Sequence, residues 1–204
     1  MSRYTGPRAR VSRRLGTNIG GTKGETIALD KRPYPPGEHG RSRRRGSVSE
    51  YLLQLQEKQK ARFSYGLTER QFRNIFAEAS RRQGVTGENM LRFLELRLDN
   101  VIYRTGWAAT RPQARQFVGH GHVNVNGRRV DIPSYRLRKG DVVELRPAAQ
   151  DFTVVQWNLD VLDRTPPAWL DRNEQFQVTV RELPIREQID IPVREQLIVE
   201  LYSK

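Results

Sequence analysis

The 204-residue chain has no cysteine, so disulfide bonds, thiolate zinc sites and cysteine nucleophiles are all excluded. It also has no apolar run near the roughly 20 residues that a membrane-spanning helix needs. Its first residues are polar and rich in arginine, without the hydrophobic stretch of a secretory signal peptide. We therefore expect a cytoplasmic chain that has no membrane partner.

Acidic residues are scarce beside basic ones. The chain has 36 Lys and Arg against 23 Asp and Glu, which gives a formal net charge of +13. Thirty of the 36 basic residues are Arg, whose planar guanidinium matches two phosphate oxygens where the Lys ammonium offers a point charge. This balance predicts a polyanionic partner.

The positive charge is unevenly distributed. Its net value is +8 over residues 1–50, +3 over 51–100, +6 over 101–150 and −4 over 151–204. No acidic residue stands between Asp99 and Asp131, and this stretch contains Arg104, Arg111, Arg115, His120, His122, Arg128 and Arg129. Because these arginines have no nearby carboxylate in the sequence, a phosphate ligand is favoured over a merely solvated basic face.

Residues 1–46 have few aliphatic side chains and eight glycines, which predicts a basic extended arm with little core of its own. A cluster near its end would repel itself, so we expect a ligand to order the arm; the cluster is Arg41, Arg43, Arg44 and Arg45. Tyr4, Tyr34 and His39 lie among the charges and are suited to stack on unpaired bases.

Residues 47–104 have the periodicity of helices. Ser47 with Glu50, and Thr68 with Gln71, each fit a capping box. The side chains expected to face inward are Leu52 and Leu55 in the first helix, Phe72, Ile75, Phe76 and Ala79 in the second, and Leu91, Leu94 and Leu98 in a third that begins near Thr86. Gly84 is suited to end the second helix.

Residues 110–145 predict a helix followed by a hairpin and a further strand. Thr110 is expected to cap the helix. The apolar face of the helix then leaves Arg111 and Arg115 one turn apart on an exposed face, where a phosphate would offset their repulsion. A strand at 122–125 leads into Asn126-Gly127, the strongest short hairpin signal, because both central residues of a type I′ turn need positive φ. The return strand is expected at 128–132, and another strand at 142–145.

Beyond residue 150, the pattern predicts strands at 152–157 and 176–183. Trp157, Trp169 and Phe176 are interpreted as core residues. Leu197, Ile198 and Leu201 are at helical spacing, which predicts a terminal helix within 193–204.

Candidate catalytic and metal motifs are incomplete. A P-loop-like glycine pair before Lys23 lacks the lysine at the required position. His120 and His122 are too few ligands for a metal site without cysteine or a nearby carboxylate. Arg97-Leu98-Asp99 resembles the catalytic aspartate motif of pseudouridine synthases, but its Thr-Gly appears only at 105–106, so a helix-capping role for Asp99 is preferred. We expect no enzyme activity and no cofactor.

Two sets of motifs carry a resemblance to a known family. The runs 110–116, 119–123 and 125–127 resemble the RNA-binding module named after ribosomal protein S-four. Motifs elsewhere resemble the bacterial-type family of small-ribosomal-subunit proteins S-four itself, at residues 4–7, 12–16, 32–40, 57–62, 132–135 and 195–204. The resemblance runs the length of the chain, in a variant without the cysteines with which some members hold zinc in the N-terminal arm.

The resemblance implies an α+β fold. It consists of a helical domain with an inserted small α+β RNA-binding module (a helix plus an antiparallel hairpin and sheet), preceded by a basic extended N-terminal arm. We place the arm at residues 1–46, the helical domain at 47–90 with completion by 184–204, and the module with its following strands at 91–183, its core being 91–157.

The family further implies a structural constituent of the small ribosomal subunit. Such a protein is a primary rRNA-binding protein that clamps a multi-helix junction and nucleates assembly, near mRNA entry and with a role in translational accuracy. The expected partners are small-subunit rRNA, neighbouring ribosomal proteins including one of the S-five type, and mRNA near the entry channel; the expected location is the cytoplasmic ribosome. We expect the acidic last quarter to face proteins. The alternatives are an RNA-modifying enzyme and a free-standing RNA-binding protein that use the same module.

The residues expected to contact RNA are basic, polar or aromatic. In the arm they are Arg3, Tyr4, Arg8, Arg10, Arg13, Arg14, Arg32, Tyr34, His39, Arg41, Arg43, Arg44 and Arg45. At the end of the first long helix they are Lys58, Lys60 and Arg62. In and around the module they are Arg104, Arg111, Arg115, His120, His122, Asn124, Asn126, Arg128, Arg129, Ser134 and Tyr135.

Overall fold

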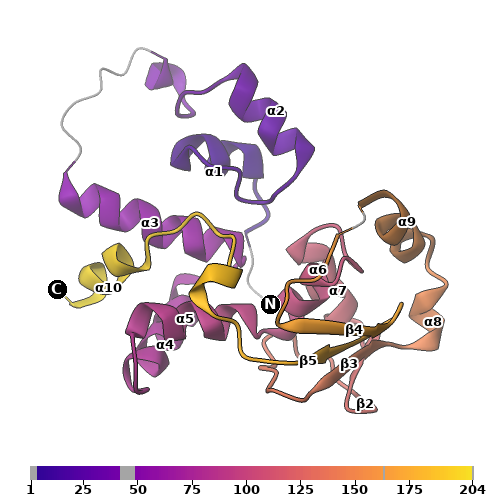
Figure 1. Ribbon diagram of the computed structural model, residues 1–204. Helices are drawn as coiled ribbons and strands as arrows, with labels where there is room; N and C mark the ends of the chain where they lie inside the picture. The colour runs from indigo at the N-terminus through magenta and orange to yellow at the C-terminus, as the bar shows by residue number, and fades with distance from the viewer. Residues whose placement is uncertain (1–3, 42–48, 163, 204) are drawn as a thin grey trace. The chain divides into compact units, whose positions relative to one another are not determined.

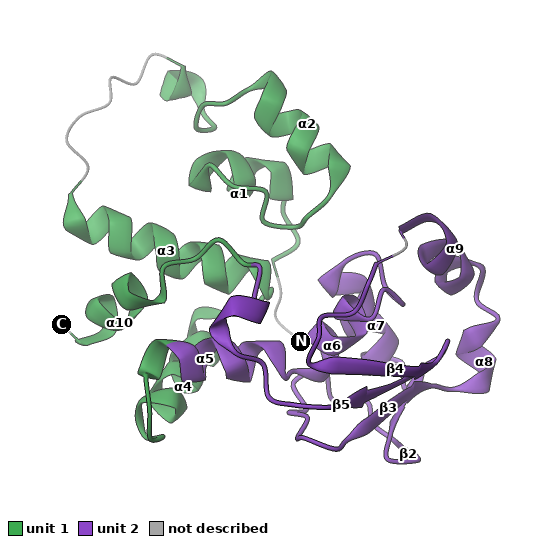
Figure 2. Ribbon diagram, viewed as in Figure 1, with its two compact units in different colours: residues 1–87, 191–204 green, residues 88–190 purple. Residues whose placement is uncertain are grey.

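The computed structural model describes residues 4–41, 49–162 and 164–203 (Figure 1). The chain forms two compact units, which Figure 2 shows in different colours. Unit 1 contains residues 1–87 and 191–204, and unit 2 contains residues 88–190. The chain therefore leaves unit 1, forms unit 2 and returns to complete unit 1 with its last helix.

Unit 1 is helical, including the part of the chain expected to be an extended arm. Its elements are α1 (Arg8–Leu15), α2 (Lys23–Lys31), η1 (Glu38–Gly40), α3 (Glu50–Ser64), α4 (Glu69–Ser80) and α10 (Glu195–Ser203). The expectation of extended structure is wrong for α1 and α2. The interactions that hold these two helices together join residues far apart in the sequence, so local composition does not reveal them.

A buried hydrogen-bond network joins α1 to α2. Ser12 donates its hydroxyl to Glu25 Oε2 at 2.7 Å, and the backbone N–H of Gly20 donates to the same oxygen at 2.7 Å. Thr22 caps α2 by accepting the Glu25 N–H on its hydroxyl at 3.4 Å. Glu25 is only 4% exposed, so its carboxylate is an internal support for the arm.

Helix α3 begins differently from the prediction. Ser49 is the cap, its hydroxyl accepting the Leu52 N–H at 3.3 Å, so Glu50 is the first helical residue and not the partner in a capping box. Ser47 lies outside the described residues. The expected inner leucines, Leu52 and Leu55, are only half-buried, and the buried positions of the helix are Gln54, Glu57 and Ala61.

Helix α10 covers the polar side of α3. Gln54 donates to Glu200 Oε2 at 3.0 Å, and Glu57 accepts the backbone N–H of Arg194 at 2.9 Å. Ile198 on α10 is fully buried. The terminal helix predicted within 193–204 is therefore confirmed.

Helix α4 begins as predicted. Thr68 and Gln71 form the reciprocal capping box, and Phe72 and Ala79 are fully buried on the predicted face. The helix ends at Ser80, before Gly84, whose φ of 102° belongs to the turn that follows.

Unit 2 packs helices against a sheet. Its elements are α5 (Thr86–Glu95), which begins in unit 1, α6 (Leu98–Arg104), α7 (Arg111–Gly119), β1 (Val123–Val125), β2 (Arg128–Arg129), β3 (Val142–Leu145), α8 (Pro147–Gln150), α9 (Thr153–Leu162), β4 (Leu170–Glu174), β5 (Gln177–Val180) and η2 (Arg186–Gln188). The strands are antiparallel in the order β2-β1-β3-β5-β4. The predicted α+β class is confirmed.

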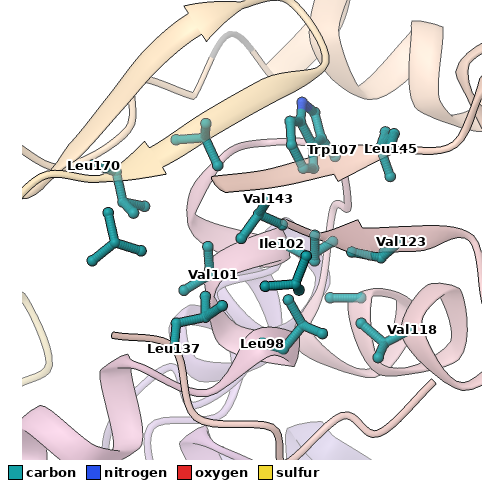
Figure 3. Packing of buried hydrophobic residues seen from close by; sticks show 14 of the residues in the cluster. Leu98, Val101, Ile102, Trp107, Val118, Val123, Leu137, Val143, Leu145 and Leu170 are labelled. Atoms are coloured by element: carbon teal, nitrogen blue, oxygen red, sulfur yellow. The ribbon is translucent and has the colours of Figure 1, made fainter. Parts of the chain in front are cut away.

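The core of unit 2 joins α6 and α7 to the sheet. Leu98 and Ile102 of α6 and Val118 of α7 are fully buried in one cluster with Val123 and Val143 of the sheet (Figure 3). These apolar side chains fix the helix and the hairpin in one rigid body, because interiors are packed at close to crystal density.

The hairpin forms as the Asn-Gly signal predicts. Asn126 has a φ of 50° and Gly127 a φ of 74°, and β1 pairs antiparallel with β2 around them. The return strand is shorter than expected, since β2 contains only Arg128–Arg129. Strand β3 matches its predicted range of 142–145.

The prediction of a strand at 152–157 is wrong, because residues 153–157 belong to helix α9. Val155 and Asn158, three residues apart, are buried, and Asn158 Nδ2 donates to the Trp107 carbonyl at 3.0 Å. Trp157 is 52% exposed, so its assignment to the core is wrong, whereas Trp169 is 1% exposed as expected. Strand β5 confirms the main part of the strand predicted at 176–183, and β4 was not predicted because four of its five residues are polar or charged.

Candidate nucleic-acid interface

A basic cluster forms where α7, β1, β2 and the end of β3 meet. We call His120, His122, Arg129 and Arg146 the hairpin cluster. His120, Arg129 and Arg146 are exposed and His122 is half-buried. In the part of the chain that the structure describes, no carboxylate forms a salt bridge with Arg129 or Arg146. The cluster is therefore open to an external anion.

Gly121 allows the side chains of Arg129 and Arg146 to approach the backbone of the turn that ends α7. It has a φ of 72°, and a side chain there would collide with the Arg129 guanidinium. Arg146 donates from a terminal guanidinium nitrogen to the Gly121 carbonyl at 3.3 Å. Both arginines thus lie against the backbone of the turn that ends α7.

The pKa of His122 lies below its ordinary value. Burial is the main cause, and the positive charges of His120, Arg146 and Arg129 add to it. Such a group senses a local positive potential, which a bound phosphate would reduce. The cluster therefore has the electrostatics of an anion site before any anion is present.

Arg146 was missed by sequence analysis. The signal that could have found it is its place directly after the predicted strand 142–145, which is the partner of the strand that follows His122. The Arg146 N–H donates to the His122 carbonyl at 3.0 Å, which fixes their separation. A basic residue at the end of a predicted strand that pairs with the hairpin would have identified the position.

Two asparagines of the predicted set shape the hairpin. Asn124 donates to Glu144 Oε1 at 2.9 Å across the strands. Asn126 donates to Asp141 Oδ1 at 2.9 Å and accepts the Val142 N–H at 2.9 Å. Their side-chain amides are therefore engaged within the protein; RNA contact by them stays a prediction.

The expectation that the arginines of residues 104–129 lack carboxylate partners is wrong for Arg104 and Arg115. Arg115 donates from two nitrogens to Asp99 Oδ2, at 3.0 and 2.8 Å. Arg97 binds both oxygens of the same carboxylate, at 3.0 and 2.7 Å. The helices α6 and α7 pack together, so the acid that ends the acid-free stretch in sequence is next to Arg115 in space.

The Asp99 carboxylate is shared by Arg97, which directly precedes α6, and Arg115 of α7. Arg111, the other exposed-face arginine of the prediction, donates to Asn100 Oδ1 at 2.8 Å, and its guanidinium carbon lies 4.2 Å from the centroid of the Tyr103 ring. Arg111 and Arg115 are both half-buried. These contacts hold the two side chains in fixed orientations.

Asp99 was expected to cap or end a helix, but it does neither. It lies in the first turn of α6, and its backbone N–H donates to the Pro133 carbonyl at 3.1 Å. It is 3% exposed and its carboxylate is occupied by Arg97 and Arg115. This surrounding is structural and gives no support to the catalytic interpretation.

Arg104 is buried, although it was predicted to face RNA. Its guanidinium grips the Glu95 carboxylate through two nitrogens, at 3.0 and 2.9 Å, and reaches Asp190 at 2.8 Å. Glu95 is fully buried. Arg104 therefore stabilises α5, α6 and the end of unit 2 from inside.

Ser134 and Tyr135 lie in the loop between the hairpin and β3, and both are exposed. The Tyr135 carbonyl accepts the Leu98 N–H at 2.9 Å, so the loop covers the start of α6. Arg128 is exposed on β2. These three side chains remain candidates for RNA contact.

In unit 1, some predicted arm residues face solvent and others build the arm. Arg10, Arg14, Arg32, His39 and Arg41 are exposed, as is Tyr4, and Arg8 is half-buried. Arg13 donates to the carbonyls of Arg32 and Tyr34 at 3.1 Å each, and its guanidinium carbon lies 5.0 Å from the Tyr34 ring centroid. Arg3, Arg43, Arg44 and Arg45 lie outside the described residues.

The three basic residues at the end of α3 have partners. Lys58 pairs with Glu69 at 2.8 Å, Lys60 pairs with Glu57 at 2.6 Å, and Arg62 donates to Gln59 Oε1 at 2.9 Å. Burial would raise the pKa of Glu69, but hydrogen bonds from Lys58 and Tyr202 outweigh it and lower that pKa. Part of the basic charge expected to meet phosphate here is therefore balanced inside unit 1.

Two classes of site were sought across the described ranges. No group of three or more His, Asp or Glu side chains there is placed to hold a metal ion. No helix of that part of the chain has the length and apolar character to cross a membrane.

Comparison with known proteins assigns the chain to a family. Residues 3–95 match the "Ribosomal protein S4/S9 N-terminal domain" and residues 96–143 match the "S4 domain". The small ribosomal subunit proteins uS4 of Nocardioides sp. and Mycobacterium avium are each 54% identical, over 206 and 207 residues, and that of Corynebacterium ammoniagenes is 51% identical over 209 residues. Each alignment covers 100% of this chain and 100% of the relative. This chain therefore belongs to the uS4 family of small ribosomal subunit proteins.

Proposed function

We propose that this protein is a structural constituent of the small ribosomal subunit that binds rRNA directly, clamps a multi-helix junction of that RNA and nucleates assembly around it. The observation that carries the proposal is the hairpin cluster: two exposed arginines and two histidines gathered at one turn, without a carboxylate pair among the described residues. Guanidinium groups in this setting bind phosphate oxygens through paired hydrogen bonds.

The clamp acts through charge that the fold holds in place. Arg111 and Arg115 are held by Asn100 and Asp99, so little side-chain freedom is lost when a phosphate approaches α7. Bridging phosphates of adjacent RNA helices lowers the repulsion that keeps a junction open. Recognition is mainly of shape, since the deep major groove of A-form RNA hides its bases from side chains.

The acidic end of the chain suits protein partners. Residues 151–204 have a net charge of −4, and exposed acids such as Asp171, Glu174 and Glu182 repel RNA. We place neighbouring ribosomal proteins, including one of the S-five type, against this part of the chain. The proposal includes a position near mRNA entry and a role in translational accuracy.

The salt dependence of binding tests the clamp. If about ten phosphates are neutralised, the logarithm of affinity falls with the logarithm of salt concentration at a slope of about −7 to −9. Filter binding of the full chain to small-subunit rRNA between low and moderate salt measures this slope. A slope shallower than about −3 would contradict the proposal that the protein clamps the RNA through many phosphates.

The rival function from another class is RNA modification by the same module. It predicts turnover of uridine or another base in the bound RNA, which mass spectrometry of digested RNA would detect. The third possibility, a free-standing RNA-binding protein, predicts that the native protein separates from small subunits in a high-salt gradient. Co-sedimentation under these conditions, without base turnover, supports the ribosomal role.

A further inference from the structure

A cavity of about 370 Å³ opens between α1 and α3 inside unit 1. Its walls are mainly apolar and consist of Val11, Leu15, Leu52, Leu55 and Phe63. Its volume lies within the range of about 300–1,000 Å³ that is usual for small-molecule sites. Leu52 and Leu55, the two leucines expected in a core, are only half-buried because they line this space.

The lining of the cavity also contains positively charged and polar side chains. Arg10, Arg14 and Arg62 line the cavity, together with the amides of Gln56 and Gln59, and no Asp or Glu is among the described residues that line it. Arg10 and Arg14 are exposed. The guanidinium carbon of Arg62 lies 4.2 Å from the centroid of the Phe63 ring. A ligand with an apolar face, hydrogen-bonding edges and a negative charge would match all three features.

Tyr4 stands at the same cavity with much of its ring exposed. It is 45% exposed, and its ring contacts the Phe63 ring edge-on, with 5.5 Å between centroids. The ring folds over Gly6, where an added Cβ would lie 2.6 Å from the Tyr4 hydroxyl. The absent side chain at Gly6 thus lets an aromatic ring sit where a planar ligand would enter.

We propose that this cavity binds one unstacked nucleobase of the bound rRNA, with its phosphate on Arg10 and Arg14. Planar bases stack on aromatic rings and guanidinium planes, and their edges pair with amides such as that of Gln56. An inorganic anion would leave the apolar walls unused, and an apolar side chain would leave the exposed Arg10 and Arg14 unused. The inference deepens the proposed function and rests on it, because it needs rRNA as the source of the nucleotide.

Filling the cavity tests the proposal. The variant Leu55→Trp places an indole in the space, and Leu53→Trp is the matched control, because Leu53 is on the same helix, 44% exposed and away from the cavity. With the full chain and a small-subunit rRNA transcript, Leu55→Trp should weaken binding about tenfold, in line with the loss of one stacked base. The salt slope should stay unchanged, because no basic residue is removed, and Leu53→Trp should bind like wild type.

Gln56→Ala tests the cavity independently, in case Leu55→Trp weakens binding only because it folds poorly. It removes an amide without adding volume, and should weaken rRNA binding about threefold while the urea unfolding curve stays in place. Wild-type affinity in both variants, beside tight and salt-sensitive binding by the wild type, overturns the cavity proposal alone. Weak binding of any RNA by the wild type overturns the proposed function as well.

A second arm identifies the source of the nucleotide. Adenosine and guanosine monophosphates are titrated into the full chain while the methyl resonances of Leu52 and Leu55 are followed by NMR. We expect weak shifts that do not saturate below millimolar concentration, because a single nucleotide lacks the other contacts of the RNA. Saturation at micromolar concentration, with rRNA affinity unchanged in Leu55→Trp, would show a site for free nucleotides and overturn the assignment to rRNA.

Discussion

Arg104 and Arg129 belong to the same acid-free stretch of sequence but stand in opposite surroundings. The Arg104 side chain is 9% exposed and grips Glu95, whose side chain is 0% exposed. Arg129 is exposed beside the turn at Gly121. The first arginine neutralises an internal charge, whereas the charge of the second is exposed at the surface.

Substituting these two arginines should therefore separate stability from binding. Arg104→Met leaves the buried Glu95 carboxylate without its guanidinium partner, and should lower the free energy of unfolding by about 3–5 kcal/mol. Arg129→Ala should change it by less than about 0.5 kcal/mol, yet reduce the salt slope of rRNA binding by about one. Urea unfolding and filter binding measure the two effects. Equal stability losses in the two variants would contradict the assignment.

His122 should make RNA binding depend on pH. Its pKa in the free protein is lowered by burial and by His120, Arg146 and Arg129, and a phosphate at the cluster should raise it. Because the bound form then takes up a proton, affinity should increase as the pH falls from about 8 toward and below the ordinary histidine pKa of about 6.5. NMR titration of the His122 ring with and without RNA checks this shift.

The matched variants are His122→Asn and Arg146→Gln. His122→Asn should remove most of the pH dependence, and Arg146→Gln should raise the free-protein pKa of His122 by removing a positive neighbour. An unchanged pKa of His122 in the RNA complex would show that no phosphate binds at the hairpin cluster.

At the scale of elements, one carboxylate joins α1 to α2 in the arm. Glu25 accepts from Ser12 and from the Gly20 backbone, and these bonds close the segment between α1 and α2. Hydrogen bonds to a charged group contribute about 1.5–3 kcal/mol each to stability. The arm of this family member, which has no cysteine, is therefore organised by hydrogen bonds to an internal acid.

Glu25→Ala should loosen α1 and α2 without unfolding the rest of unit 1. Loss of even one of these hydrogen bonds, about 1.5–3 kcal/mol, corresponds to amide exchange about 10- to 100-fold faster across residues 8–31. Asp30→Ala on the exposed side of α2 is the control and should leave exchange unchanged. Hydrogen exchange with mass spectrometry makes the comparison, and equal protection in both variants would show that Glu25 does not hold the arm.

What the sequence predicted depended on the range of the interaction. The Thr68 and Thr110 caps and the Asn126-Gly127 turn are local, and all three were predicted correctly. Helices α1 and α2 depend on Ser12 and Glu25, which are too far apart for a local pattern to connect. Helix α9 was misjudged as a strand because its β-branched residues favour strands, while tertiary contacts such as that of Asn158 favour a helix.

The candidate site shows the same limit. Sequence analysis found His120, His122 and Arg129 because the helix-hairpin pattern places them together. It wrongly treated Arg115 as lacking an acid. Asp99 is 16 residues earlier in the sequence, and the two side chains meet only because α6 packs against α7. Linear charge counts therefore indicate a polyanion partner but do not distinguish the arginines that bind it from those that are paired.

At the scale of the whole molecule, the two units are not consecutive halves of the sequence, because unit 1 contains both ends of the chain. Residues 191–204 return to unit 1, where Arg194 and Glu200 bond to α3 and Tyr202 donates to Glu69 at 3.0 Å. The core of unit 2 is contained within residues 96–180. The two units should accordingly respond differently to loss of the end of the chain.

Ending the chain at Asp190 should destabilise unit 1 and spare unit 2. The truncation removes the buried Ile198 and leaves Gln54 and Glu57 without their α10 partners, while Asp190 keeps its pairing with Arg104. Loss of a buried aliphatic side chain alone costs about 2–5 kcal/mol. Hydrogen exchange should show lost protection in α3 and α4 and retained protection in β1, β3 and β5, with Glu200→Gln as a mild control. A uniform loss of protection across both units would show that they unfold as one.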